Sequence, residues 1–99
     1  MAYQIEFAES VKTHLQVLTV GQRATVLDAI ERHLANEPLV ETRNRKPLRP
    51  NPVAPWELRV GTMRVFYDVS EGAPQLVRVL AVGVKERNVL RIGGQEIQL

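Results

Sequence analysis

Two stretches near the middle of the chain, 56–60 and 63–69, alternate between apolar and polar positions. A period of two residues is typical of half-buried β-strands. Gly61 and Thr62, which separate the stretches, fit a two-residue type II′ turn in which the glycine takes a positive φ. The pattern therefore predicts an antiparallel hairpin. One face carries Trp56, Leu58, Val60, Met63, Val65, Tyr67 and Val69, and the other carries Glu57, Arg59, Arg64, Phe66 and Asp68.

The residues before this hairpin predict one short strand and two helices. Residues 3–7 alternate as a strand does, and from about residue 9 the apolar positions change to helical spacing. These positions are Val11, Leu15 and Leu18. Residues 19–22 match a Thr-x-x-Gln capping box, so we expect a second helix to begin there. Pro38 ends this helix, because proline is a typical stop signal just after a helix.

The remaining sequence predicts a loop, a turn and three further strands. Residues 40–55 contain four prolines and a cluster of basic residues, which predict a mobile basic loop without regular structure. Residues 71–74 form a turn, and the nearly continuous apolar run at 76–84 is typical of a central strand. Two very short strands are expected around Gly93-Gly94, and their alternating apolar residues offer an edge to another chain.

The order of these elements predicts an α+β fold in a single domain, residues 1–99. An N-terminal strand and a two-helix hairpin pack with an antiparallel meander sheet, the helices on one face, and a short C-terminal strand or tail follows. The other face, with Arg59 and Arg64, is expected to stay open to solvent. Two arginines and an aromatic residue there indicate a surface for an anionic partner.

Composition excludes several kinds of chemistry. The 99 residues contain no cysteine, which removes disulfides, thiolate metal sites and cysteine nucleophiles. No charged leader region and no apolar run long enough to span a membrane is present, so we expect a cytoplasmic location and no membrane partner. No metal-ligand spacing or glycine-rich phosphate loop stands out, and no cofactor or metal is expected. His14 and His33 fall within the predicted helices and are expected at the surface.

The charge of the chain is unevenly distributed. Between residues 43 and 64, six basic residues stand against Glu57 alone, although the whole chain has a formal net charge of only +2. The rest of the chain is therefore net acidic. This asymmetry favours an oriented approach to a polyanion such as nucleic acid, while a plain solvated surface accounts for the charge cluster equally well.

Arg64 is the strongest single candidate for chemistry. A guanidinium on a rigid strand can hold a phosphate bidentately or stabilise the charge that develops on it. The alternative is a structural ion pair with Asp68 or Glu57. Lys85 and Arg87, at the end of the next strand, are candidates for binding the same anion or are solvated strand ends.

Other residues suit contacts with a nucleic-acid backbone or with a base. The basic residues of the predicted loop are Arg43, Arg45, Lys46 and Arg49, which fit phosphate contacts or an ordinary solvated loop. Phe66 is either a base-stacking residue or a core residue, whereas Trp56 favours the core.

The hairpin, the following run Val79-Leu80-Ala81-Val82-Gly83 and Lys85 together resemble the RelE/ParE toxin superfamily of bacterial type II toxin–antitoxin systems. The runs Asn36-Glu37-Pro38 and Lys46-Pro47-Leu48 are also similar to that family, and the resemblance covers nearly the whole chain. It implies a RelE-like fold and a toxin that is held silent by a cognate antitoxin wrapped around its surface.

In the RelE branch of the family, the toxin cleaves mRNA on the ribosome by attack of a 2′-hydroxyl on its adjacent phosphate, without a metal. By residue match, Arg64 corresponds to the family's strand arginine and Lys85 to its basic residue after Val-Gly. This chain has Pro55 and Glu57 where a RelE-type site has two lysines, and residues 89–91 where a tyrosine usually follows. Glu57 is then the candidate general base. The candidate RNA-binding residues are Arg43, Arg45, Lys46, Arg49, Arg59, Phe66 and Arg87.

The resemblance leaves two other functions open. The ParE branch shares the fold but inhibits DNA gyrase by binding, and the missing tyrosine and lysines favour that branch. A third possibility is a non-toxic binding module that acts as part of a repressor complex, in which the apolar C-terminal edge is the important surface. The basic loop and Arg64 fit RNA cleavage best.

Overall fold

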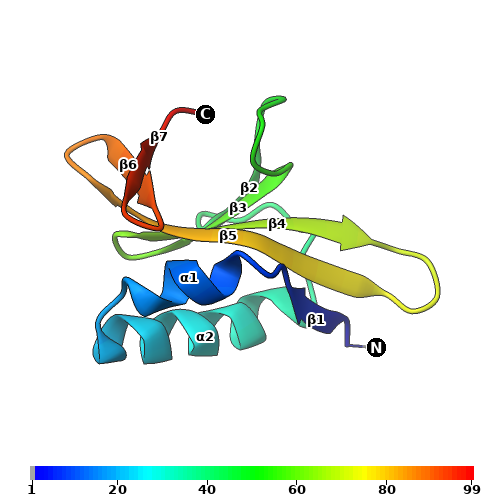
Figure 1. Ribbon diagram of the computed structural model, residues 1–99. Helices are drawn as coiled ribbons and strands as arrows, with labels where there is room; N and C mark the ends of the chain where they lie inside the picture. Colours follow the sequence, from blue (N-terminus) through cyan, green and yellow to red (C-terminus); the bar gives the residue numbers. More distant parts are fainter. Residues whose placement is uncertain (1) are drawn as a thin grey trace.

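Figure 1 shows the computed structural model, which describes residues 2–99. Its elements in chain order are β1 (Gln4–Phe7), α1 (Val11–Gln16), α2 (Val20–Leu34), β2 (Arg45–Pro47), β3 (Trp56–Val60), β4 (Met63–Ser70), β5 (Leu76–Glu86), β6 (Val89–Ile92) and β7 (Gln95–Ile97). The predicted hairpin, central strand and two short final strands are all confirmed. No helix among the described residues is long and apolar enough to cross a membrane.

The strands form one sheet in the order β2-β3-β4-β5-β6-β7, and β1 pairs with β5 in parallel. The two helices lie against one face of this sheet, while the β6–β7 hairpin and the segment between β2 and β3 rise from the other face (Figure 1). The predicted α+β architecture, with the helix pair on one face of an antiparallel meander, is therefore confirmed.

Local sequence signals account for the helix and turn geometry. The Thr19 hydroxyl accepts the backbone N–H of Gln22, and the Gln22 side chain accepts the backbone N–H of Thr19, so the predicted capping box is confirmed. In the β3–β4 hairpin, Val60 pairs with Met63, which leaves Gly61 and Thr62 as a two-residue loop. Gly61 has a φ of +61°, as its place in a type II′ turn requires.

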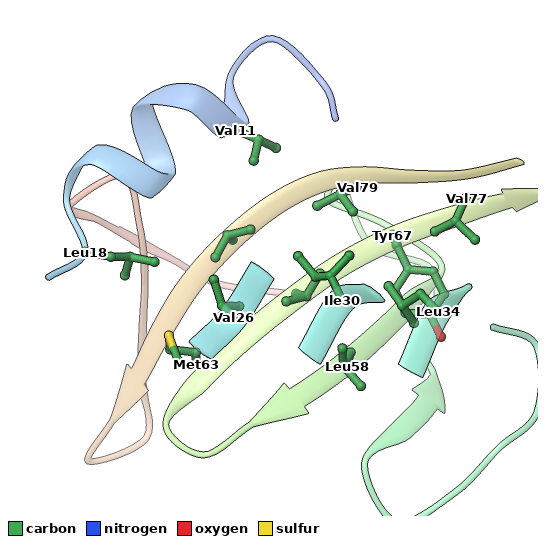
Figure 2. Close-up of a cluster of buried hydrophobic side chains, with 12 residues drawn as sticks. Val11, Leu18, Val26, Ile30, Leu34, Leu58, Met63, Tyr67, Val77 and Val79 are labelled. Atoms are coloured by element: carbon green, nitrogen blue, oxygen red, sulfur yellow. The ribbon is translucent and has the colours of Figure 1, made fainter. Parts of the chain in front are cut away.

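The main core fills the space between the helices and the sheet. Figure 2 shows side chains from both helices meeting those of β3, β4 and β5. The buried residues of this main core are Val11, Leu18, Val26, Ile30, Leu34, Leu58, Met63, Val65, Tyr67, Val77, Val79 and Val82. Trp56 packs against this cluster and stacks on Tyr67, with ring centroids 6.0 Å apart, so its assignment to the core is confirmed.

The expectation that the opposite face stays open is wrong. A second cluster covers part of it, and its buried members are Ala54, Phe66, Ala81, Leu90 and Ile92. Phe66 is 0% exposed. The β6–β7 hairpin and residues 48–54 supply the cover, because packing their apolar residues on Phe66 and Ala81 removes apolar surface from water.

The prediction of a mobile loop at 40–55 is also wrong. Residues 45–47 form strand β2, which pairs with β3 at the edge of the sheet. Beyond it, the Asn51 side chain accepts the backbone N–H groups of Val53 and Ala54 and donates to the carbonyls of Arg49 and Ala54. These bonds order the proline-rich segment from within.

Strand β5 carries a bulge that changes which of its residues face the helices. Phe66 pairs with Ala81 while the next residue, Tyr67, pairs with Val79, so Leu80 is an extra residue in β5. Before the bulge Val79 faces the main core, and after it Val82 does. Gly83 and Lys85 therefore lie on the face opposite the helices.

One edge of β5 is shared by two strands with a gap between them. Strand β1 pairs with β5 as far as Val79, and β6 begins to pair at Gly83. His14 fills the gap, because its Nδ1 accepts the backbone N–H of Val82 at 3.3 Å. Partial burial lowers the pKa of His14 from its ordinary value of 6.5. The expectation that His14 is an ordinary surface residue is therefore wrong.

Gly83 is required for the close approach of β6 to β5. A Cβ atom at this position would lie 2.5 Å from the Arg91 carbonyl oxygen, whereas a Cβ at Gly21 in α2 would meet nothing within 4 Å. We expect Gly83→Ala to lower the free energy of unfolding by about 1–3 kcal/mol through overpacking. Gly21→Ala should raise it by up to about 1 kcal/mol. Urea titration of both variants checks this, and equal effects would contradict it.

The bond from Val82 to His14 also predicts a pH dependence. Because the folded pKa of His14 lies below its unfolded value of 6.5, the stabilisation is complete above pH 6.5 and is lost as the pH falls through the folded pKa. Urea titrations between about pH 7.5 and about pH 5.5 should show a smaller loss of stability for His14→Gln than for the unchanged chain. Burial and the charges of Arg45 and Arg32 also lower the pKa of His33, so His33→Gln should reduce the loss as well, and the two variants together separate the contributions of the two histidines. Identical slopes for His14→Gln and the unchanged chain would refute this role of His14.

Candidate functional site

The uncovered part of the face opposite the helices contains a pocket of about 450 Å³. Glu57 from β3 and Lys85 from β5 both line it. The remaining walls come from Asn88, Leu90, Ile97, Gln98 and Leu99. The structure thus brings together two of the three predicted catalytic residues, and the β6–β7 hairpin closes one side of the space between them.

Arg64 lies beside this pocket rather than in its wall. Across the sheet it pairs with Arg59 of β3 and Gly83 of β5. Its Nη1 donates to the backbone carbonyls of Gly61 at 2.8 Å and Met63 at 2.9 Å, which ties the guanidinium to the turn of its own hairpin. The side chain is therefore held rigidly, with 8% of the residue exposed.

The structural ion pair considered for Arg64 is absent. Among residues 2–99 the ion pairs are Arg32–Asp28 and Lys46–Glu57, and neither involves Arg64. Burial lowers the pKa of Arg64 from its ordinary value, the nearby charge of Arg59 lowers it further, and Glu57 opposes both. A partly buried guanidinium with a cationic neighbour favours the arrival of an anion, because an anion would repay the lost solvation.

Glu57 is an acidic side chain on a face of the sheet that it shares with Arg59, Arg64 and Lys85. It is 5% exposed, and its Oε2 lies 3.8 Å from the Lys46 Nζ. The register explains the contact, because Lys46 of β2 is paired directly with Glu57 of β3. The sequence pattern did not predict Lys46 as a neighbour of Glu57, because the prolines around Lys46 indicated a loop where the structure has a three-residue strand. Alternation along 45–47 was the only available signal.

The other candidate residues separate into exposed and buried groups. The exposed ones are Arg43, Arg49, Arg59 and Arg87. Arg87 adopts a φ of +52° and Asn88 a φ of +64°, which place them in the tight turn between β5 and β6, next to the pocket. These four guanidinium groups remain candidates for contact with an anionic polymer.

Two of the predicted RNA-binding residues are not available for that role. Arg45 is 9% exposed, and its guanidinium donates to the carbonyls of Val40 and His33 at 3.1 and 2.6 Å. It anchors β2 to the end of α2. Phe66 is fully buried in the second cluster and cannot stack on a base.

The arrangement suits the binding and turnover of a phosphodiester. A carboxylate, a lysine and an immobilised arginine lie on one face of a rigid sheet, which provides a proton acceptor and positive groups for the charge of a reacting phosphate. Exposed arginines surround these groups and can hold the flanking phosphates.

Comparison with solved structures finds the same fold in a protein of known assembly. The chain is similar to a chain in the crystal structure of the toxin–antitoxin complex RelBE2 from Mycobacterium tuberculosis, with a TM-score of 0.73 and 27% sequence identity. The match covers 86% of this chain and 100% of that chain. No family model and no curated protein matches the sequence.

Arg43 and Arg45 test the division of the basic segment into structural and exposed residues. We expect Arg45→Met to lower the free energy of unfolding by about 1–3 kcal/mol, because two part-buried carbonyl groups lose the buried donor that joins β2 to the end of α2. Arg43→Met removes the same charge from an exposed site and should leave stability unchanged within error. Thermal and urea unfolding measure both, and a loss of stability in both variants would show that charge alone is responsible.

Proposed function

We propose, from the premise that this chain has the RelE-like toxin fold, that it is the toxin of a type II toxin–antitoxin module. The similar solved structure is a toxin–antitoxin complex, which supports a small antitoxin protein as the partner of this chain. The toxin would act in the cytoplasm, where ribosomes and mRNA are found.

The activity that the site supports best is cleavage of mRNA on the ribosome. The observation that carries it is the grouping of Glu57, Arg64 and Lys85 on the face opposite the helices. The absence of a carboxylate partner for Arg64 within residues 2–99 adds support, because this guanidinium is held in place without being neutralised.

In the proposed reaction the RNA supplies its own nucleophile. The Glu57 carboxylate takes the proton of a 2′-hydroxyl, and the 2′ oxygen forms a bond to the adjacent phosphorus. The bond from phosphorus to the 5′ oxygen breaks, and this oxygen takes a proton from the Lys85 ammonium. The products are a 2′,3′-cyclic phosphate and a 5′-hydroxyl. Arg64 stabilises the extra negative charge on the phosphate oxygens during the step.

Expression in bacteria without an antitoxin tests this proposal. We expect early, translation-dependent mRNA cuts with the unchanged chain and a loss of about 10²-fold or more in cleavage rate with Arg64→Ala, because a charge-stabilising group is removed. Arg45→Met is the matched control, since it also removes a buried arginine with two backbone hydrogen bonds but lies outside the site.

The outcomes separate the functions that the sequence left open. Cuts that persist in Arg64→Ala would contradict the assigned role of this residue. Growth arrest without cuts, together with altered plasmid supercoiling, would replace RNA cleavage by inhibition of DNA gyrase. If growth is not arrested, the remaining candidate function is that of a non-toxic binding module.

A further inference from the structure

Strand β2 places two neighbouring basic residues on opposite faces of the sheet. Successive side chains of a strand point to opposite sides. The Arg45 side chain reaches the carbonyls of Val40 and His33, beside α2. Lys46 therefore points to the other face, where Glu57 is its direct cross-strand neighbour.

The backbone on both sides of Lys46 is held in place. The Arg59 N–H donates to the Asn44 carbonyl at 2.7 Å, and the Leu48 N–H donates to the Pro55 carbonyl at 2.8 Å. Together with the Arg45 anchor, these bonds fix the strand to which the Lys46 side chain is attached. Lys46 is thus a residue of the rigid sheet, in contrast to an ammonium group on a solvated loop.

The contact between Lys46 and Glu57 joins a solvent-facing group to a buried one. The Lys46 side chain is 48% exposed and the Glu57 side chain 7% exposed. The pair is 3.8 Å apart, and water screens the half-exposed ammonium, while Glu57 has little contact with water. The ammonium therefore stands at the glutamate that lines the pocket, where it can act on the orientation and charge of that carboxylate.

Other cations lie near Glu57, but the structure distinguishes Lys46 from them. Arg59 from β3, Arg64 from β4 and Lys85 from β5 share the same face. Of these four cations, only Lys46 lies within ion-pair distance of the carboxylate among residues 2–99. Its ammonium is also exposed enough to meet a phosphate that approaches from solvent.

We infer that Lys46 is a positioning residue for the proposed RNA cleavage. Its ammonium holds the Glu57 carboxylate toward the reacting 2′-hydroxyl. It also supplies a positive charge next to this general base from β2, which is outside the β3–β4 hairpin. This inference rests on the proposed function. It assigns Lys46 to the chemical step, whereas a loop lysine that only contacts the RNA backbone would affect binding alone.

A split between kcat and KM tests the assignment, using ribosomes programmed with a short mRNA as substrate. Lys46→Met should lower kcat about tenfold or more and change KM less than about threefold, because the base loses its orienting partner. Lys46→Arg keeps a cation at the same strand position and should restore most of kcat. Arg43→Met removes one exposed positive charge away from Glu57 and should raise KM without lowering kcat.

A double variant provides a second, independent test of the role of Lys46. In a Glu57→Gln background the carboxylate is already absent, so adding Lys46→Met should cause no further loss of kcat. Additive losses would overturn the inference, as would an unchanged kcat in Lys46→Met or a change confined to KM. If the unchanged chain cuts no mRNA, the proposed function and this inference both fail; if it cuts and Lys46→Met cuts equally well, only the inference fails.

Discussion

One extra residue in strand β5 sets the position of the charged groups on which the candidate site depends. Val77 and Val79 face the helices, and strict alternation would place Lys85 on that same face. The bulge at Leu80 shifts the alternation by one, so that Val82 faces the core and Lys85 faces the opposite side with Glu57 and Arg64. A bulge is thus what allows the core and the charged face to share one strand.

The second cluster gives this charged face its shape. Phe66 and Ala81 present a small apolar area on the sheet, and the β6–β7 hairpin and residues 48–54 fold onto it. The β6–β7 hairpin and the residues after it become one side of the space in which Glu57 and Lys85 are found. Because the cations stand on paired strands and Arg64 is held by two carbonyls, the binding of the proposed anion would require little reorganisation.

Much of the fold was predictable from short-range patterns, and so was part of the site. Periodicity located the hairpin and the central strand, and the capping box located the start of α2. Alternation in the hairpin predicts that Glu57 and Arg64 share one face, and they do so in the structure. The face of Lys85 depends on the bulge in β5, which the sequence pattern does not reveal. The chemical roles of all three residues stay predictions. The segment at 40–55 misled because prolines normally exclude strands. Strand β2 tolerates Pro47 because it lies at the edge of the sheet, where one side needs no backbone donor.

Local sequence specifies the elements of this protein, since spacing, capping and turn chemistry act within about ten residues. Tertiary structure decided the rest. The pairing of Lys46 with Glu57, the burial of Arg45 and Phe66, and the acceptance of the Val82 N–H by His14 all join segments distant in sequence. Such contacts depend on register and on the packing of the whole sheet, and a shift of one residue exchanges the faces on which neighbouring side chains lie.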